Sequence, residues 1–122
     1  MEETKRRILC VEDDEDTCEM LTLALQLSGY EVVSAHTFAD AITKALTANF
    51  DAYILDSRLP DGSGVDLCKE IREFNSDTPI LFYSADAYPR EIEEAMNAGA
   101  QVYMVKPIDP LEVERNIREL IH

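Results

Sequence analysis

The sequence predicts an α/β fold, with a single doubly wound domain spanning residues 1–122. Short apolar runs typical of strands buried on both faces alternate five times with segments whose apolar residues recur at helical spacing. The connections between these segments are short, and the chain contains no linker, internal repeat or low-complexity segment. Such alternation predicts a (βα)5 arrangement, in which a five-stranded parallel sheet carries helices on both faces through right-handed crossovers.

The expected strands are short apolar runs, of which "RILCV" and "PILFYS" are examples. An apolar run without alternation is the pattern of a strand that helices cover on both sides. The expected strands cover residues 7–11, 31–35, 52–55, 79–84 and 102–105.

Each strand is followed by a helical pattern. Gly29 and Gly99 mark helix ends, and Asp109 followed by Pro110 marks the start of the last helix. The expected helices cover residues 14–28, 37–48, 65–74, 89–98 and 109–121, and the segment 58–64 is expected to be a loop. The residues expected on the core-facing sides are Cys18, Leu21, Leu25, Phe38, Ala41, Ile42, Ala45, Leu46, Leu67, Ile71, Phe74, Val113, Ile117, Leu120 and Ile121.

The amino-acid composition indicates which kinds of partner the protein is expected to bind and in which cellular compartment it is expected. The formal net charge is −14, which argues against direct binding to nucleic acid or to an anionic membrane and fits a basic partner or bound cations. Cys10, Cys18 and Cys68 are an odd number without a closely spaced pair, so we expect reduced, packed thiols in a cytoplasmic protein. No apolar run approaches the roughly 18 residues of a membrane span.

Chemically capable side chains stand where the expected strands end. Glu12 and Asp13 follow the first strand, and Asp56 follows the third. Ser84 ends the fourth strand, and Lys106 follows the fifth. Taken singly, a carboxylate here is more often a helix cap, and a lysine is more often solvated. In a parallel α/β sheet, however, all the carboxyl ends meet at one edge, so these five side chains are expected to converge.

This set of side chains suits phosphoryl transfer. Carboxylates supply the oxygen ligands that Mg²⁺ prefers. A carboxylate can also attack phosphorus and form an acyl phosphate. The reaction then requires positioning and charge neutralisation, which a metal and Lys106 provide, while Ser84 can donate a hydrogen bond to a phosphoryl oxygen.

Four segments carry a resemblance to a known family: "ILCVEDD", "YILDSRLPDGSG", "LFYSA" and "VYMVKP", in that order. The chain resembles the CheY-like receiver domain of two-component response regulators over nearly all of its length. The resemblance implies the flavodoxin-like strand order 2-1-3-4-5. It also implies that Asp56 is the phospho-acceptor, and that Mg²⁺ is held by Glu12, Asp13, Asp56 and the backbone carbonyl of Arg58.

The same resemblance implies roles for residues around the acceptor. Ser84 matches the hydroxyl switch residue, and Tyr103 matches the switch aromatic residue. Lys106 matches the lysine that contacts the phosphate, and Pro107 would follow a cis peptide bond. Gly62 and Gly64 would let the loop after Asp56 turn tightly.

Two further positions are expected to tune the lifetime of the phosphoryl group. Arg58 and Asp86 each lie two residues beyond a key site residue, at positions that influence hydrolysis in the family. Because both would border the same phosphate, we also expect them to form an ion pair across the mouth of the site.

The implied function is a switch, not an enzyme with a separate substrate. A sensor histidine kinase or a phosphotransfer protein would phosphorylate Asp56, and the face formed by the fourth helix, fifth strand and fifth helix would repack for an output partner or a homodimer. The kinase, the pathway and the presence of an output domain after residue 122 remain open.

Two alternative functions fit the sequence less well. An aspartate-nucleophile phosphatase would need a second aspartate where Arg58 stands, together with a substrate-capping domain. A metal-free interaction module would have no use for the complete acidic set. Within "VEDDED", we expect Asp14 to cap a helix or face solvent, and Glu15 and Asp16 to lie in a first helical turn.

Overall fold

A computed structural model describes residues 5–121. Residues 1–4 and 122, which the expected domain includes, lie outside the described part of the chain. The predicted fold class is confirmed: five parallel strands form one sheet in the order β2-β1-β3-β6-β7, which is 2-1-3-4-5 when only the strands of this sheet are numbered. These strands are β1 (Arg7–Val11), β2 (Glu31–Ala35), β3 (Ala52–Leu55), β6 (Ile80–Ser84) and β7 (Val102–Val105).

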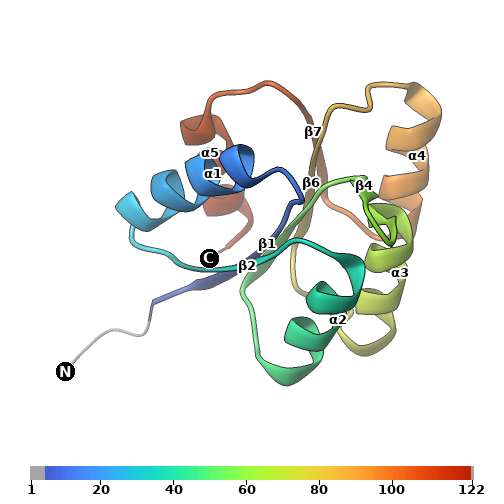
Figure 1. The fold of residues 1–122 in the computed structure, drawn as a ribbon, viewed down its shortest axis with the longest axis horizontal. Helices are drawn as coiled ribbons and strands as arrows, with labels where there is room; N and C mark the ends of the chain where they lie inside the picture. The colour runs from blue at the N-terminus through green and yellow to red at the C-terminus, as the bar shows by residue number, and fades with distance from the viewer. Residues whose placement is uncertain (1–4, 122) are drawn as a thin grey trace.

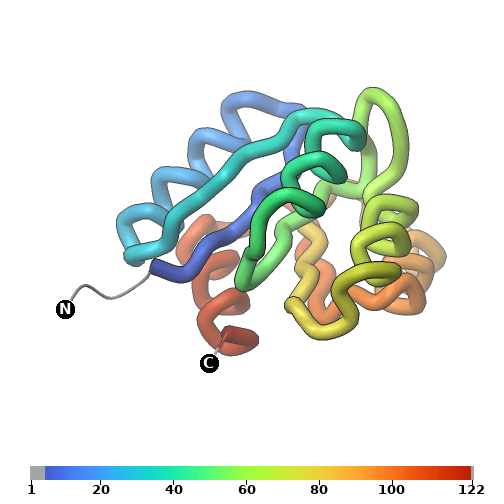
Figure 2. The backbone as a smooth tube through the Cα atoms, turned by 90° about the horizontal axis from the view of Figure 1, so that it is seen from below, coloured from blue at the N-terminus to red at the C-terminus, as the bar shows by residue number. Residues whose placement is uncertain are grey.

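Helices cover both faces of the sheet (Figures 1 and 2). α1 and α5 lie on one face, and α2, α3 and α4 lie on the other. No helix within residues 5–121 is long and apolar enough to cross a membrane. The helices are α1 (Glu15–Leu27), α2 (Phe38–Thr47), α3 (Gly64–Phe74), α4 (Pro89–Ala98) and α5 (Pro110–Leu120).

The strands are mainly apolar because each face of the sheet meets a helical layer. In β1, Leu9 and Val11 point toward α2, α3 and α4, whereas Ile8 and Cys10 point toward α1 and α5. The central strands repeat this alternation, as a side-chain period of two requires. The three cysteines are free and buried, as the sequence predicts.

Helix ends follow the local signals. The Asp14 carboxylate accepts a hydrogen bond from the Thr17 N–H and caps α1, which confirms one of its two expected roles. Asp109 caps α5 in the same way and is followed by Pro110. Gly99 ends α4 with a φ of 118°, in the left-handed region that glycine adopts readily.

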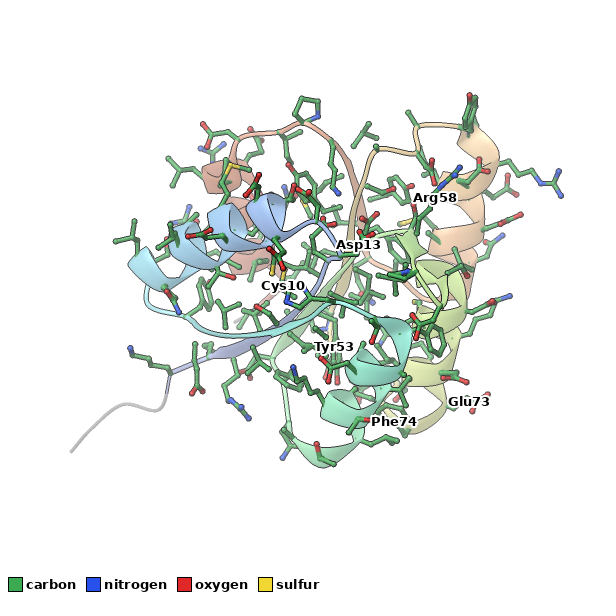
Figure 3. The ribbon with its side chains drawn as sticks, in the orientation of Figure 1. Cys10, Asp13, Tyr53, Arg58, Glu73 and Phe74 are labelled. Atoms are coloured by element: carbon green, nitrogen blue, oxygen red, sulfur yellow. The ribbon has the colours of Figure 1, made fainter. Side chains whose placement is uncertain are left out.

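Two expected core residues are exposed. Leu46 and Phe74 have 61% and 43% of their surface accessible, although their spacing continues the apolar faces of α2 and α3. Each lies in the last turn of its helix, and both line one shallow depression at that end of the domain. Figure 3 shows Phe74 at the end of the sheet opposite to Asp13.

The segment 58–64 is more ordered than the expected loop. It contains the antiparallel pair β4 (Arg58–Leu59) and β5 (Gly62–Ser63), whose two-residue strands are too short to leave a periodic signal. The segment turns tightly, as expected, because only Pro60 and Asp61 separate the paired residues Leu59 and Gly62. The turn does not use a left-handed glycine, since neither Gly62 nor Gly64 has a positive φ. Gly64 is required for a different reason: a Cβ there would lie 2.1 Å from the backbone carbonyl oxygen of Asp56.

We expect Gly64→Ala to destabilise the domain by about 2–4 kcal/mol, because the added methyl group collides with backbone that cannot move without displacing Asp56. Urea unfolding measures the change. Gly29→Ala is the matched control: Gly29 has a φ of 95° but open space around it, so only the backbone cost of about 1 kcal/mol applies. Equal losses in the two variants would contradict the steric explanation.

Candidate functional site

Three carboxylates meet at the carboxyl edge of the sheet. Glu12, Asp13 and Asp56 each place one oxygen within 4.8 Å of the others. Backbone hydrogen bonds fix this arrangement, because the Glu12 N–H donates to Ala35 (2.9 Å) and the Asp56 N–H donates to Val11 (3.0 Å). The strand ladder thus continues one residue past β1 and β3 and sets where the side chains begin.

Lys106 reaches the same cluster from the end of β7. Its Nζ lies 2.7 Å from Glu12 Oε1 and 3.2 Å from Asp56 Oδ2. Its own N–H donates to the Ser84 carbonyl at 2.8 Å, which continues the ladder between β6 and β7. The peptide bond from Lys106 to Pro107 is cis, as the resemblance implies.

Burial and neighbouring charges have opposing effects on the pKa values of Glu12 and Lys106. Burial and the neighbouring Asp56 carboxylate raise the pKa of Glu12 to about 7, against the opposing effect of Lys106. Burial alone would lower the pKa of Lys106, but its hydrogen bond to Glu12 and the charge of Asp56 outweigh burial and raise it. The ammonium therefore stays charged and partly offsets the crowded carboxylates.

A chain of hydroxyl groups lies beside Asp56. Ser84 is buried, and its Oγ is hydrogen-bonded to Ser57 Oγ. Ser57 Oγ also donates to Asp86 Oδ2 at 2.8 Å. Our sequence reasoning missed Ser57, and the only signal was a small polar residue directly after the strand-end Asp56. A small hollow of about 160 Å³ at this point is lined by Asp13, Asp56, Ser57, Arg58, Ser84, Ala85, Asp86 and Lys106.

The predicted ion pair between Arg58 and Asp86 is present. Arg58 Nε lies 2.9 Å from Asp86 Oδ2, and the arginine side chain is 78% exposed whereas that of Asp86 is 16% exposed. The hydrogen bonds from Arg58 and Ser57 hold the pKa of Asp86 below its usual range. Figure 3 shows Arg58 above the carboxyl edge of the sheet, on the same side as Asp13.

Tyr103 joins this network from β7. Its ring stacks on Phe82, with centroids 5.5 Å apart and an interplanar angle of 7°. Its hydroxyl donates to the backbone carbonyl of Asp86 at 2.7 Å. Tyr103 therefore combines core packing with a polar contact to the loop that carries Asp86.

With this geometry in place, the match to a known family is decisive. A family model for the response regulator receiver domain matches residues 8–118. The chain belongs to this family. PhoP of Bacillus subtilis, an alkaline phosphatase synthesis transcriptional regulatory protein, is 33% identical to this receiver domain over 116 residues, which are 95% of the chain and 48% of PhoP. The receiver domain thus spans about half the length of the curated relatives it matches.

Solved receiver domains share the same fold. A CheY-like response regulator receiver domain protein from Methanospirillum hungatei has a TM-score of 0.92 and 28% identity, with 95% of this chain and 93% of that chain covered. The response regulator TrrA of Thermotoga maritima, solved in complex with Mg²⁺ and BeF, has a TM-score of 0.86 and 31% identity, with 95% and 99% covered.

The acidic cluster of this receiver domain fits a magnesium ion. Its three carboxylate oxygens are hard ligands, and their mutual distances suit a cation that keeps part of its water shell. Burial and the neighbouring Asp56 carboxylate raise the pKa of Glu12, and a bound cation would stabilise its charged form. The role of the Arg58 carbonyl as a ligand stays a prediction.

We expect the stability of the metal-free domain to fall as pH rises from about 5 to 8. The folded state retains the Glu12 proton up to a pKa of about 7, whereas the unfolded chain releases it near 4.5, so ionisation in this window favours unfolding. Relative to Glu12→Gln, which is neutral throughout, the wild type should lose about 1–3 kcal/mol. Urea unfolding in a chelator measures both proteins, and parallel pH profiles would refute the assignment to Glu12.

Proposed function

We propose that Asp56 accepts a phosphoryl group from a partner histidine kinase or phosphotransfer protein in a Mg²⁺-dependent reaction. One observation carries this proposal: Asp56 lies at the edge of the sheet between an acidic pair and a partly buried lysine, beside a small polar hollow. A nucleophilic carboxylate, a cation site and a fixed positive charge are the parts that phosphoryl transfer requires.

In the proposed reaction, an Asp56 carboxylate oxygen attacks the phosphorus of a phosphohistidine. The new O–P bond forms as the P–N bond breaks, and the bonding pair leaves with the imidazole nitrogen. Mg²⁺, held by Glu12, Asp13, Asp56 and the Arg58 carbonyl, would neutralise charge on the phosphoryl oxygens. Lys106 loses its contact with the Asp56 oxygen and binds a phosphoryl oxygen instead.

The signal passes through Ser84 and the loop after β6. Ser84 reorients to donate to a phosphoryl oxygen, and the Asp86 N–H, which donates to Ser84 Oγ at 3.1 Å, follows it. Tyr103 is hydrogen-bonded to the Asp86 carbonyl and therefore responds to the same movement. The face formed by α4, β7 and α5 then repacks for an output partner or a second receiver domain.

The receiver domain in this proposal is a phospho-acceptor that catalyses only its own modification and its hydrolysis. Arg58 stands where a phosphatase with an aspartate nucleophile would carry a second aspartate, which argues against a separate substrate. The free buried cysteines support a cytoplasmic setting, where the kinase would be found. The net charge of −14 disfavours direct contact with DNA or an anionic membrane by this domain.

We expect acetyl phosphate with Mg²⁺ to add one phosphoryl group to the wild type and none to Asp56→Asn, because the amide lacks the nucleophilic oxygen. Intact-mass spectrometry measures the addition, and omission of Mg²⁺ should prevent it. Asp77→Asn, a substitution of an exposed aspartate away from the site, is the matched control and should be modified normally. Uptake by Asp56→Asn equal to that of the wild type would overturn the proposal.

We expect Arg58→Ala and Asp86→Ala each to change the lifetime of phosphorylated Asp56 by up to about tenfold, a barrier change of roughly 1.4 kcal/mol. Both residues of the ion pair line the hollow, and in this proposal the pair acts as a gate that restricts the attacking water. Loss of phosphate is followed by mass spectrometry, while the effect on the free energy of unfolding should stay within about 1 kcal/mol for Arg58→Ala.

The double variant should show less than the sum of the two effects, because both substitutions open the same gate. Arg90→Ala, which removes an exposed ion pair with Glu94 on α4, is the control and should leave the lifetime unchanged. Strictly additive effects, or unchanged lifetimes in both single variants, would remove the gate from the mechanism.

A further inference from the structure

Ser57 carries a hydroxyl group that lies between the hydroxyl of Ser84 and the carboxylate of Asp86. It directly follows Asp56 and has only 9% of its surface accessible. Its Oγ is hydrogen-bonded both to Ser84 Oγ and to Asp86 Oδ2. Neither bond is required by the fold of the sheet, since Ser57 lies after the end of β3.

The direction of these hydrogen bonds follows from counting protons. A serine hydroxyl has one proton to donate, and an ionised carboxylate can only accept. Asp86 Oδ2 lies 2.9 Å from Arg58 Nε in an ion pair, so this carboxylate is an acceptor only, and Ser57 donates its proton to it. The remaining bond between the two serines must therefore be donated by Ser84 to Ser57.

Ser84 is consequently fully engaged before modification. Its proton points to Ser57, and its oxygen accepts from the Asp86 N–H at 3.1 Å. No hydrogen bond joins Ser84 to Asp56 among the described residues. To donate to a phosphoryl group on Asp56, the Ser84 hydroxyl has to leave Ser57.

We propose that Ser57 is a positioning residue that holds the Ser84 proton away from Asp56 until the aspartate is modified. The inference rests on the proposed function, because it assigns a resting partner to the hydroxyl that later binds the phosphoryl group. Arg58 also donates to the Asp86 carboxylate that orients Ser57. The exposed ion pair and the buried Ser84 hydroxyl are thus connected by consecutive hydrogen bonds, because Ser84 donates to Ser57 and Ser57 donates to Asp86.

The hydrogen bond between Ser84 and Ser57 should weaken the binding of a phosphoryl mimic at Asp56, and this weakening can be measured. Ser57→Ala removes the acceptor for the Ser84 proton only in the resting state, and therefore favours the modified state. Loss of one neutral hydrogen bond corresponds to an increase of about three- to tenfold in affinity for a phosphoryl mimic. Beryllium fluoride with Mg²⁺ is the suitable probe, because it does not hydrolyse as an acyl phosphate does. Its affinity therefore reports binding without the effect of the Arg58–Asp86 ion pair on hydrolysis.

The experiment is a double-mutant cycle. Affinity for beryllium fluoride at fixed Mg²⁺ is measured by NMR for the wild type, Ser57→Ala, Ser84→Ala and the double variant. We expect Ser57→Ala to bind more tightly than the wild type, and to have no effect when Ser84 is already alanine. Ser57→Ala also removes the hydrogen bond to Asp86. An effect on affinity that arises only from that loss is the same with and without the Ser84 hydroxyl, and it therefore cancels in the cycle.

Two control variants distinguish a positioning role of the Ser57 hydroxyl from a general effect on the stability of the fold. Ser57→Thr keeps the hydroxyl and should restore affinity close to that of the wild type. Ser34→Ala removes a different partly buried hydroxyl, which accepts from Cys18 at 3.4 Å, and should shift the melting temperature without changing the affinity.

The outcomes distinguish the two proposals. If the wild type binds beryllium fluoride at Asp56 but Ser57→Ala binds no more tightly, the role of Ser57 is wrong and the proposed function stands. The same holds if Ser57→Ala gains equally with and without the Ser84 hydroxyl. If the wild type itself shows no Mg²⁺-dependent binding at Asp56, the proposed function fails and the role of Ser57 fails with it.

Discussion

The contact of Lys106 with Glu12 and Asp56 is the interaction on which the site depends. Three carboxylates that share a region within 4.8 Å repel one another, and Glu12 is almost fully buried. The lysine Nζ, 2.7 Å from Glu12 and 3.2 Å from Asp56, offsets part of that repulsion from inside the domain. Burial and the neighbouring Asp56 carboxylate nevertheless raise the pKa of Glu12, against the effect of Lys106, and a bound divalent cation would stabilise its charged form.

This arrangement is possible because the sheet is rigid at its carboxyl edge. The strands are apolar on both faces and covered by two helical layers, so their ends cannot shift without loss of core packing. Backbone hydrogen bonds then extend the ladder to Glu12, Asp56 and Lys106. Gly64 adds a second constraint, because its backbone packs directly against the Asp56 carbonyl. Asp56 is therefore held both by its own backbone hydrogen bond and by the neighbouring loop.

Asp86 connects the residues around the acidic site with Tyr103 on β7. Its carboxylate is shared by Arg58 on the surface and Ser57 in the interior, its N–H contacts Ser84, and its carbonyl binds Tyr103. A change in any one of these bonds alters the position of the others, since they meet on one residue. Under the proposed function, these contacts would link a modification at Asp56 to the surface formed by α4, β7 and α5.

Much of this could be predicted from the sequence, because the informative signals are local. The short, mainly apolar runs locate each of the five strands to within one residue, and caps such as Asp14 and Asp109 locate helix starts. The chemical types at the strand ends indicate the acidic site, because parallel strands bring their carboxyl ends to one edge. The exposure of Leu46 and Phe74, the steric need for Gly64 and the bridging position of Ser57 were not predictable in this way. Periodicity reports which side of a helix a residue occupies, but not whether another layer covers it there. Ser57 and Ser84 are 27 residues apart, and their contact exists only because β3 and β6 are neighbours in the folded sheet.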